Sequence, residues 1–141
     1  MPTRKATATW EGTLKSGKGT FRGETGLGGA YSFASRFENG TGSNPEELLA
    51  AAEAACFSMA LSLALEKAGT PPTRIDTEAA CTIDKVGEGF KIIKMRLSVR
   101  ASVPKLADNK FQEIARATKE GCPVSVALRG VDIELDAHLI Q

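Results

Sequence analysis

The chain has 141 residues, a net charge of +1 and 42% hydrophobic residues, which suffice for one domain with a sizeable core. Acidic and basic residues are interspersed, so the charge pattern gives no basis for binding nucleic acid or a membrane surface. Three widely spaced cysteines and one histidine fit neither a secreted disulfide scaffold nor a zinc site. No positive flank or cleavage site follows Met1. We therefore expect a soluble, cytoplasmic, single-domain protein spanning residues 1–141.

Three strands are predicted in the first third of the chain. Residues 5–12 alternate in polarity, and a turn rich in glycine and serine after them predicts that 13–23 continue a hairpin. The glycine-rich stretch 26–29 is not followed by a helix, so a nucleotide-binding loop is not favoured. Residues 30–38 read as the third strand, with Arg36 on the face opposite its aromatic residues.

A long helix is predicted after these strands. Asn44 is a suitable N-cap, Pro45 suits the first helical position, and Glu47 completes an Asn-x-x-Glu capping box. The run from Leu48 to Leu65 is rich in alanine and leucine, which favour helix. Gly69 then ends it.

This helix is apolar on nearly every side, which predicts that it is buried on nearly every side. Its length would allow a membrane span, but Glu53, Ser58, Ser62 and the many alanines argue against one. One small sheet cannot cover so much apolar surface. We therefore expect a second copy of the chain to cover the rest, giving a homodimer.

The second half of the chain predicts strands over 75–86 and 91–103, then a helix over 108–120 capped by Asp108. Cys122 and Pro123 resemble the N-cap and first position of a short helix through Leu128. Residues 131–140 form the last predicted strand, with His138 on its polar face. This order predicts an α+β fold with antiparallel sheets around the long buried central helix.

Cys56 lies in the middle of the long helix, where a buried thiol is commonly only a small hydrophobe. Burial raises the pKa of such a thiol and keeps it inert unless a cation lies close. Its own helix offers no cation, so a reactive Cys56 requires a base from another segment. Glu53, one turn earlier, would raise the thiol pKa further, and we expect it to point away or pair with a base.

Cys122 has the opposite environment. At the start of a short helix a thiol meets unpaired N–H groups, which lower its pKa. Local physics thus favours Cys122 as the more reactive thiol, and a plain N-cap without chemistry is the alternative. Cys81 falls on the core face of a strand and is expected to be structural.

Two cysteine motifs resemble a known family. The segments Asn44-Pro45-Glu46-Glu47-Leu48, Ala54-Ala55-Cys56-Phe57-Ser58 and Gly121-Cys122-Pro123-Val124-Ser125 are similar to those of the OsmC/Ohr family, the osmotically inducible protein C and organic hydroperoxide resistance proteins. The resemblance runs the whole length of the chain. Trp10-Glu11-Gly12 and Arg36-Phe37 resemble the OsmC branch more than the Ohr branch.

The resemblance implies a thiol peroxidase with an intertwined homodimer and two active sites at the subunit interface. In that family the cysteine matching Cys56 attacks the peroxide and becomes a sulfenic acid, and the one matching Cys122 resolves it to a disulfide. An arginine and a glutamate assist, here Arg36 and Glu46. Because Glu46 precedes Cys56 by ten residues, about 15 Å along a helix, we expect it to act by holding Arg36.

The family also implies the partners. Leu49, Phe57, Met59 and partner-chain residues would form an apolar surround that favours organic hydroperoxides over hydrogen peroxide. An external dithiol must reduce the disulfide, and no metal, haem or flavin is needed. Two alternatives remain: a redox sensor that oxidises once and signals, and a non-catalytic dimer that binds a small molecule or lipid.

Overall fold

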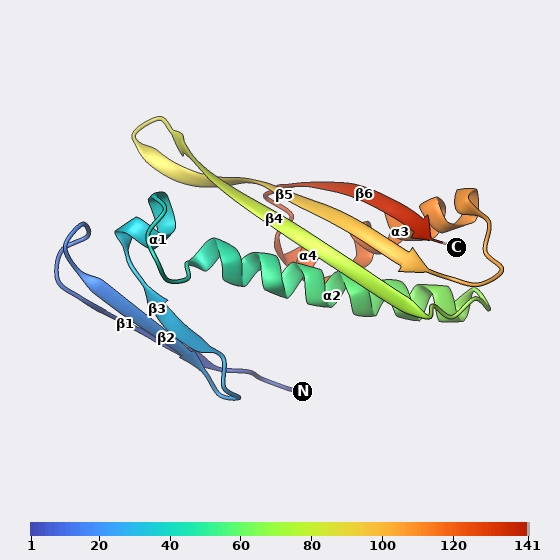
Figure 1. The fold of residues 1–141 in the computed structure, drawn as a ribbon, viewed down its shortest axis with the longest axis horizontal. Helices are drawn as coiled ribbons and strands as arrows, with labels where there is room; N and C mark the ends of the chain where they lie inside the picture. Colours follow the sequence, from blue (N-terminus) through green and yellow to red (C-terminus); the bar gives the residue numbers. More distant parts are fainter. Residues whose placement is uncertain (141) are drawn as a thin grey trace. The chain divides into compact units, whose positions relative to one another are not determined.

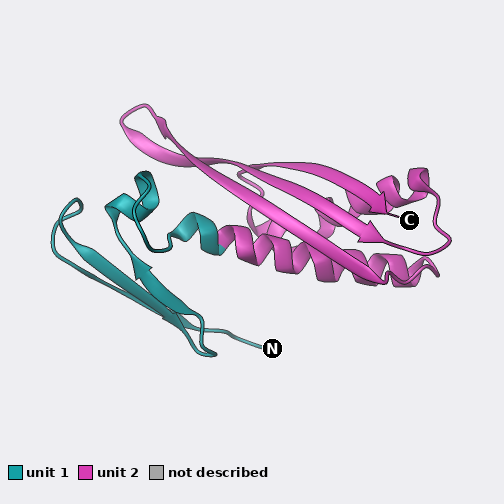
Figure 2. Ribbon diagram, in the orientation of Figure 1, with its two compact units in different colours: residues 1–48 teal, residues 49–141 magenta. Residues whose placement is uncertain are grey.

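The computed structural model describes residues 1–140 and has the α+β composition expected from the sequence (Figure 1). The chain divides into two compact units, Met1–Leu48 and a second from Leu49 onward, so the boundary falls inside the long helix (Figure 2). The single domain over 1–141 stays a prediction.

Unit 1 contains a three-stranded antiparallel sheet of β1 (Ala6–Glu11), β2 (Lys18–Gly23) and β3 (Gly28–Tyr31) in sequence order. The first two strands pair from Ala6 opposite Gly23 to Glu11 opposite Lys18, which confirms the predicted hairpin. The Trp10 and Tyr31 rings pack 5.4 Å apart between centroids. Most β1 side chains are exposed in the single chain.

The predicted strand over 30–38 is wrong in its second half. After Tyr31 the chain forms the short helix α1 (Phe33–Phe37), which begins at a capping box. The Ser32 side chain accepts from the Ser35 N–H at 3.1 Å, and Ser35 Oγ accepts from the Ser32 N–H at 2.8 Å. These reciprocal hydrogen bonds pair backbone N–H groups that have no partner within the first turn of a helix. The alternating aromatic residues suggested a strand, but the serine pair decides the local structure.

The long helix α2 (Pro45–Lys67) begins and ends as predicted. Asn44 Oδ1 accepts the Glu47 N–H at 2.8 Å, which confirms the N-cap. The second half of the expected capping box is not formed, because the Glu47 carboxylate instead accepts from Ser43 Oγ at 2.6 Å. At the other end Gly69 adopts a φ of +84°, a left-handed conformation that favours glycine.

Unit 2 contains the sheet β4–β5–β6, built from β4 (Arg74–Val86), β5 (Gly89–Ser102) and β6 (Asp132–Ile140). The β4–β5 pair is an antiparallel hairpin, as expected. The β5–β6 pair is parallel, so the expectation of purely antiparallel sheets is corrected. The helices α3 (Asp108–Gly121) and α4 (Pro123–Ala127) join these two strands and form the crossover that a parallel pair requires.

The core of unit 2 lies between this sheet and the helices α2 and α3, which cover the same face (Figure 1). The α2 side contributes Phe57, Leu61 and Leu65, each 0% exposed. The strand β5 turns alternate side chains inward, as the pattern predicted, and these are Met95, Leu97, Val99 and Ala101. Val103, just after the strand, is buried as well. Ile93, expected among them, is 39% exposed near the hairpin end. The predicted cap of α3 is wrong: Asp108 lies in the first turn of the helix, and its N-cap is Ala107.

The opposite face of α2 is uncovered in the single chain. Met59 is 77% exposed and Leu63 is 51% exposed, so one chain does not bury the helix on nearly every side as expected. By length and composition alone α2 would pass as a membrane-crossing helix, a test that core helices of soluble proteins also pass. The packing of Phe57 and Leu61 against the sheet gives it the role of a core helix.

Candidate active site

Two cysteines of unit 2 meet where α2 and α4 approach each other. Cys122 donates its thiol proton to Cys56 Sγ, and the two sulfurs lie 2.8 Å apart although 66 residues separate them. Cys122 is 1% exposed, whereas Cys56 is half-buried. Two thiols this close can form a disulfide when one of them is oxidised.

The short helix α4 forms for the local reasons that the sequence suggested. Cys122 is its N-cap residue and Pro123 occupies the first turn, where a missing N–H costs nothing. The Cys122 side chain makes no capping hydrogen bond, so its sulfur remains available to Cys56. The C-terminal end of α3 positions the same residue, because the Cys122 N–H donates to the Thr118 carbonyl at 2.9 Å.

The environment of Cys56 shifts its ionisation. Burial raises the pKa of the Cys56 thiol above its ordinary value, and the adjacent Cys122 thiol adds to the increase. The backbone N–H of Val124 in α4 acts in the opposite direction, because a hydrogen bond to the sulfur stabilises the thiolate. The Glu53 charge raises the pKa again. Among residues 1–140, no cation is among the groups that shift the pKa of this thiol.

Glu53 is not placed as expected. It is expected to point away from the Cys56 thiol or to pair with a base. Instead it is 0% exposed, its charge acts on that thiol, and its Oε1 accepts a hydrogen bond from Ser125 Oγ rather than from a base. Its Oε2 is buried and has no hydrogen-bond partner among residues 1–140. Sequence reasoning missed the role of Ser125. The available signal was its spacing, since Ser125 follows Cys122 by three residues just as Cys56 follows Glu53.

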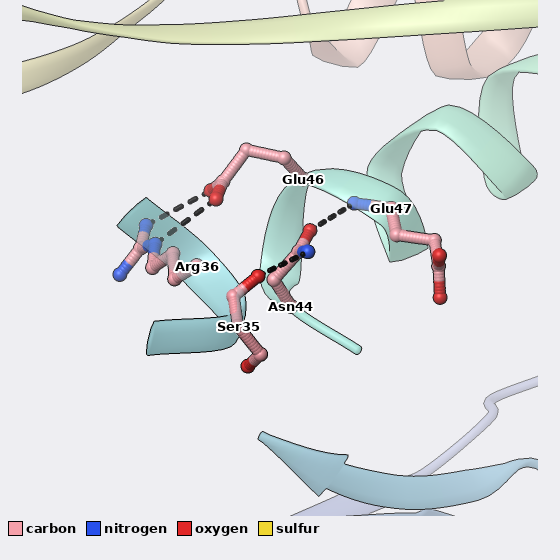
Figure 3. Close-up of polar contacts among 5 residues, drawn as sticks. All are labelled: Ser35, Arg36, Asn44, Glu46 and Glu47. Atoms are coloured by element: carbon pink, nitrogen blue, oxygen red, sulfur yellow. Dashed lines mark hydrogen bonds and ion pairs between the residues drawn. The ribbon is translucent and has the colours of Figure 1, made fainter. Parts of the chain in front are cut away.

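In unit 1, Arg36 of α1 and Glu46 of α2 form an ion pair joined by two parallel hydrogen bonds (Figure 3). Arg36 Nε donates to Oε1 at 3.0 Å and Nη2 to Oε2 at 2.9 Å. The side chain of Glu46 is 7% exposed and that of Arg36 is 35% exposed. The predicted pairing of these two residues is therefore present, and the buried carboxylate distinguishes it from a solvated surface pair.

A third contact fixes this pair. Asn44 Nδ2 donates to the Ser35 carbonyl at 3.0 Å, so the residue that caps α2 also holds the end of α1 (Figure 3). Ser35 in turn donates from its Oγ to the Ser43 carbonyl at 2.6 Å. The loop between the two helices is thus tied at both ends, which sets where the Arg36 guanidinium can lie.

Arg36 also borders a mostly apolar cavity of about 260 Å3 within unit 1. Its lining is dominated by large apolar side chains, namely Trp10, Leu14, Tyr31, Phe33 and Phe37. The guanidinium carbon lies 5.3 Å from the centre of the Phe37 ring, a cation–π distance. A charged group at the edge of an apolar cavity is suited to a ligand with one polar end and one apolar end.

The predicted site residues therefore form two pairs, Cys56 with Cys122 in unit 2 and Arg36 with Glu46 in unit 1. Cys81 is half-buried on β4, opposite Met95 in the sheet register. His138 lies on the polar face of β6, as expected, with Nε2 3.0 Å from an Asp136 oxygen.

Comparison with known proteins identifies the family. The model of the OsmC-like protein family matches residues 38–136. Peroxiredoxin OsmC of Escherichia coli K12 is 49% identical over 138 residues, 96% of each chain. Organic hydroperoxide resistance protein OhrB of Bacillus subtilis is 38% identical over 101 residues, 70% of this chain and 72% of that protein.

Solved structures agree with these matches. An organic hydroperoxide resistance protein from Elizabethkingia anophelis superimposes with a TM-score of 0.75 at 26% identity, covering 99% of this chain and 98% of the other. An OsmC-like protein from Mycoplasma pneumoniae shares the fold at 15% identity, with the same TM-score of 0.75 and 99% of each chain covered. The chain described here belongs to the OsmC-like protein family.

Proposed function

We propose that this protein is a thiol peroxidase that reduces organic hydroperoxides to alcohols, and hydrogen peroxide more weakly. The observation that carries the proposal is the approach of the Cys56 and Cys122 sulfurs to 2.8 Å. A purely structural thiol in α2 would not need a second thiol from the start of another helix. The names of similar proteins, a peroxiredoxin and an organic hydroperoxide resistance protein, support the same peroxidase class.

The proposed reaction has two steps on the protein. The Cys56 thiolate attacks the distal peroxide oxygen, the O–O bond breaks, and the alkoxide leaves and takes up a proton to become the alcohol. Cys56 is thereby oxidised to a sulfenic acid. The Cys122 sulfur then attacks the Cys56 sulfur, and the hydroxyl leaves with the Cys122 proton as water. An external dithiol reduces the resulting disulfide and restores both thiols.

Arg36 and Glu46 are proposed to assist the first step. The raised pKa of Cys56 requires a nearby cation for thiolate formation, and among residues 1–140 none of the groups that shift this pKa is a base. Arg36 is the proposed cation, and Glu46 is the carboxylate that orients it through two hydrogen bonds. The apolar cavity beside Arg36 supports an organic substrate.

The active form is proposed to be a cytoplasmic homodimer. Met59 and Leu63 are exposed on α2 of the single chain, and a stripe of large apolar side chains on a core helix is typical of a subunit interface. The dimer would place a second copy of α2 against this face and give two active sites.

Cysteine variants test the proposal. Wild-type protein with dithiothreitol should consume cumene hydroperoxide with many turnovers, and faster than it consumes hydrogen peroxide. Cys56→Ser should abolish consumption, and Cys122→Ser should change the dependence on the reductant. Cys81→Ser is the matched control and should retain wild-type activity. Full activity in Cys56→Ser would refute the peroxidase assignment.

The same assay separates the two alternatives. If the wild-type protein stops after one turnover despite excess dithiothreitol, it is a redox sensor. If hydroperoxide does not oxidise Cys56 at all, the protein is a non-catalytic binding protein.

A further inference from the structure

Beside the two thiols lies a buried polar pair that the proposed reaction does not use. Glu53 is 0% exposed and Ser125 is 5% exposed, and Ser125 Oγ donates a hydrogen bond to Glu53 Oε1. The second carboxylate oxygen is buried without a hydrogen-bond partner within residues 1–140. Burying a carboxylate that is only half satisfied is costly, so the contact calls for an explanation.

The spacing of the four residues relates this pair to the thiols. Glu53 precedes Cys56 by three residues on α2, and Ser125 follows Cys122 by three residues on α4. Residues three apart on a helix lie on the same face, one turn from each other. The Cys56–Cys122 contact and the Glu53–Ser125 contact therefore join the same two helices, about one turn apart.

The helix α4 depends on such contacts for its position. It spans only Pro123–Ala127, and a helix of this length is not stable by its own hydrogen bonds. Its N-cap side chain makes no capping bond, so the Cys122 sulfur is not held by the helix terminus itself. Ser125 is the residue of α4 whose side chain bonds to α2 in a buried contact.

We propose that the Glu53–Ser125 hydrogen bond is a positioning contact for the resolving cysteine: it holds α4 against α2 so that the Cys122 sulfur stays within reach of the Cys56 sulfur. The proposal rests on the peroxidase function above. It concerns the second step, in which the Cys122 sulfur forms the S–S bond, the S–O bond of the Cys56 sulfenic acid breaks, and the hydroxyl leaves with the Cys122 proton as water. Glu53 and Ser125 undergo no covalent change.

The charge of Glu53 and its hydrogen bond have separable effects. The charge opposes ionisation of the Cys56 thiol, so it does not help the first step. The hydrogen bond serves the second step. Glu53→Gln removes the charge and keeps a carbonyl oxygen that can accept from Ser125. Ser125→Ala keeps the carboxylate and removes the donor.

The experiment follows a single turnover of reduced protein with one equivalent of cumene hydroperoxide. Mass spectrometry then quantifies, over time, the Cys56–Cys122 disulfide and the Cys56 sulfenic acid that dimedone has trapped. Ser125→Ala should form the disulfide at least about tenfold more slowly, accumulate the dimedone adduct, and form Cys56 sulfinic acid with excess peroxide. Its consumption of the first equivalent of hydroperoxide should be unchanged. Ser125→Thr restores a hydroxyl and should restore disulfide formation.

Two Glu53 variants and one control variant complete the test. Glu53→Gln should form the disulfide as fast as the wild type. Glu53→Met removes the acceptor with little change in volume, a replacement that buried ionic groups commonly tolerate, and it should reproduce the Ser125→Ala defect. Ser58→Ala is the control, because it removes another α2 hydroxyl contact, to Thr77 at 2.8 Å. Disulfide formation at the wild-type rate in Ser125→Ala or Glu53→Met overturns the proposal. Failure of the wild-type protein to consume hydroperoxide refutes the proposed function instead.

Discussion

Arg36 and Glu46 come from neighbouring helices and share two parallel hydrogen bonds of 3.0 and 2.9 Å. The carboxylate is buried and the guanidinium is one-third exposed, so Glu46 fixes an arginine whose remaining surface faces outward. Two hydrogen bonds to one carboxylate fix the orientation of the planar guanidinium group, which a single hydrogen bond does not do. The first prediction depends on this geometry.

Arg36→Lys should lower kcat/KM for cumene hydroperoxide by about tenfold or more, because an ammonium group cannot reproduce the two-point contact. Glu46→Gln should produce a similar loss, since the neutral amide cannot form the charge-assisted pair. The matched control is Arg74→Lys, because Arg74 makes the same two-bond contact to Asp76 on an exposed strand. Equal losses in Arg36→Lys and Arg74→Lys would contradict a specific role for Arg36.

The second prediction concerns the pH dependence of Cys56. Burial, Cys122 and Glu53 raise the pKa of its thiol. The thiolate is the reactive form, so the alkylation rate of Cys56 should increase with pH. Glu53→Gln removes one of the causes, and the midpoint of the rate profile should move to lower pH. Iodoacetamide alkylation across pH, measured in a Cys81→Ser background, checks this. A midpoint that stays in place or rises in Glu53→Gln would show that the carboxylate does not act on the thiol.

The ends of α2 were predictable because their signals are local. The Asn44 cap and the Gly69 stop each act within a few residues. Which side of α2 faces the core was not predictable, because apolar residues surround the helix and no polar stripe marks an outer face. The inward position of Glu53 was missed for this reason. Its partner Ser125 lies 72 residues away in the sequence, and only the matching three-residue spacings from Cys56 and Cys122 relate the two.

Two other differences between the predicted and the observed secondary structure have similar causes. The strand expected over 30–38 followed from alternating aromatic residues, whereas the serine capping box at Ser32 starts α1 there. The parallel pairing of β6 depends on where α3 and α4 return the chain, which is a tertiary property. The cysteine and Arg36–Glu46 pairs were expected from the family resemblance, since the residues alone favoured Cys122, not Cys56, as the more reactive thiol.

The third prediction tests the capping box of α1. Ser32→Ala removes the acceptor for the Ser35 N–H and should lower the free energy of unfolding by about 1 kcal/mol. Urea denaturation followed by circular dichroism measures the change. Thr41→Ala is a suitable control, because Thr41 is exposed in the loop between α1 and α2. A change in the control as large as that in Ser32→Ala would argue against a capping role.

The fourth prediction compares two leucines of α2 and tests the proposed dimer. Leu61 is 0% exposed, and Leu61→Ala should lower the free energy of unfolding by about 2–5 kcal/mol through lost burial and a cavity. Leu63, two residues on, is 51% exposed in the single chain. Leu63→Glu places a charge on the face proposed to meet a second subunit, so it should convert the dimer to a monomer in sedimentation velocity. Lys67→Glu, at the end of the same helix, is the control and should leave the dimer intact. A dimer that persists in Leu63→Glu would exclude this face of α2 as the subunit interface.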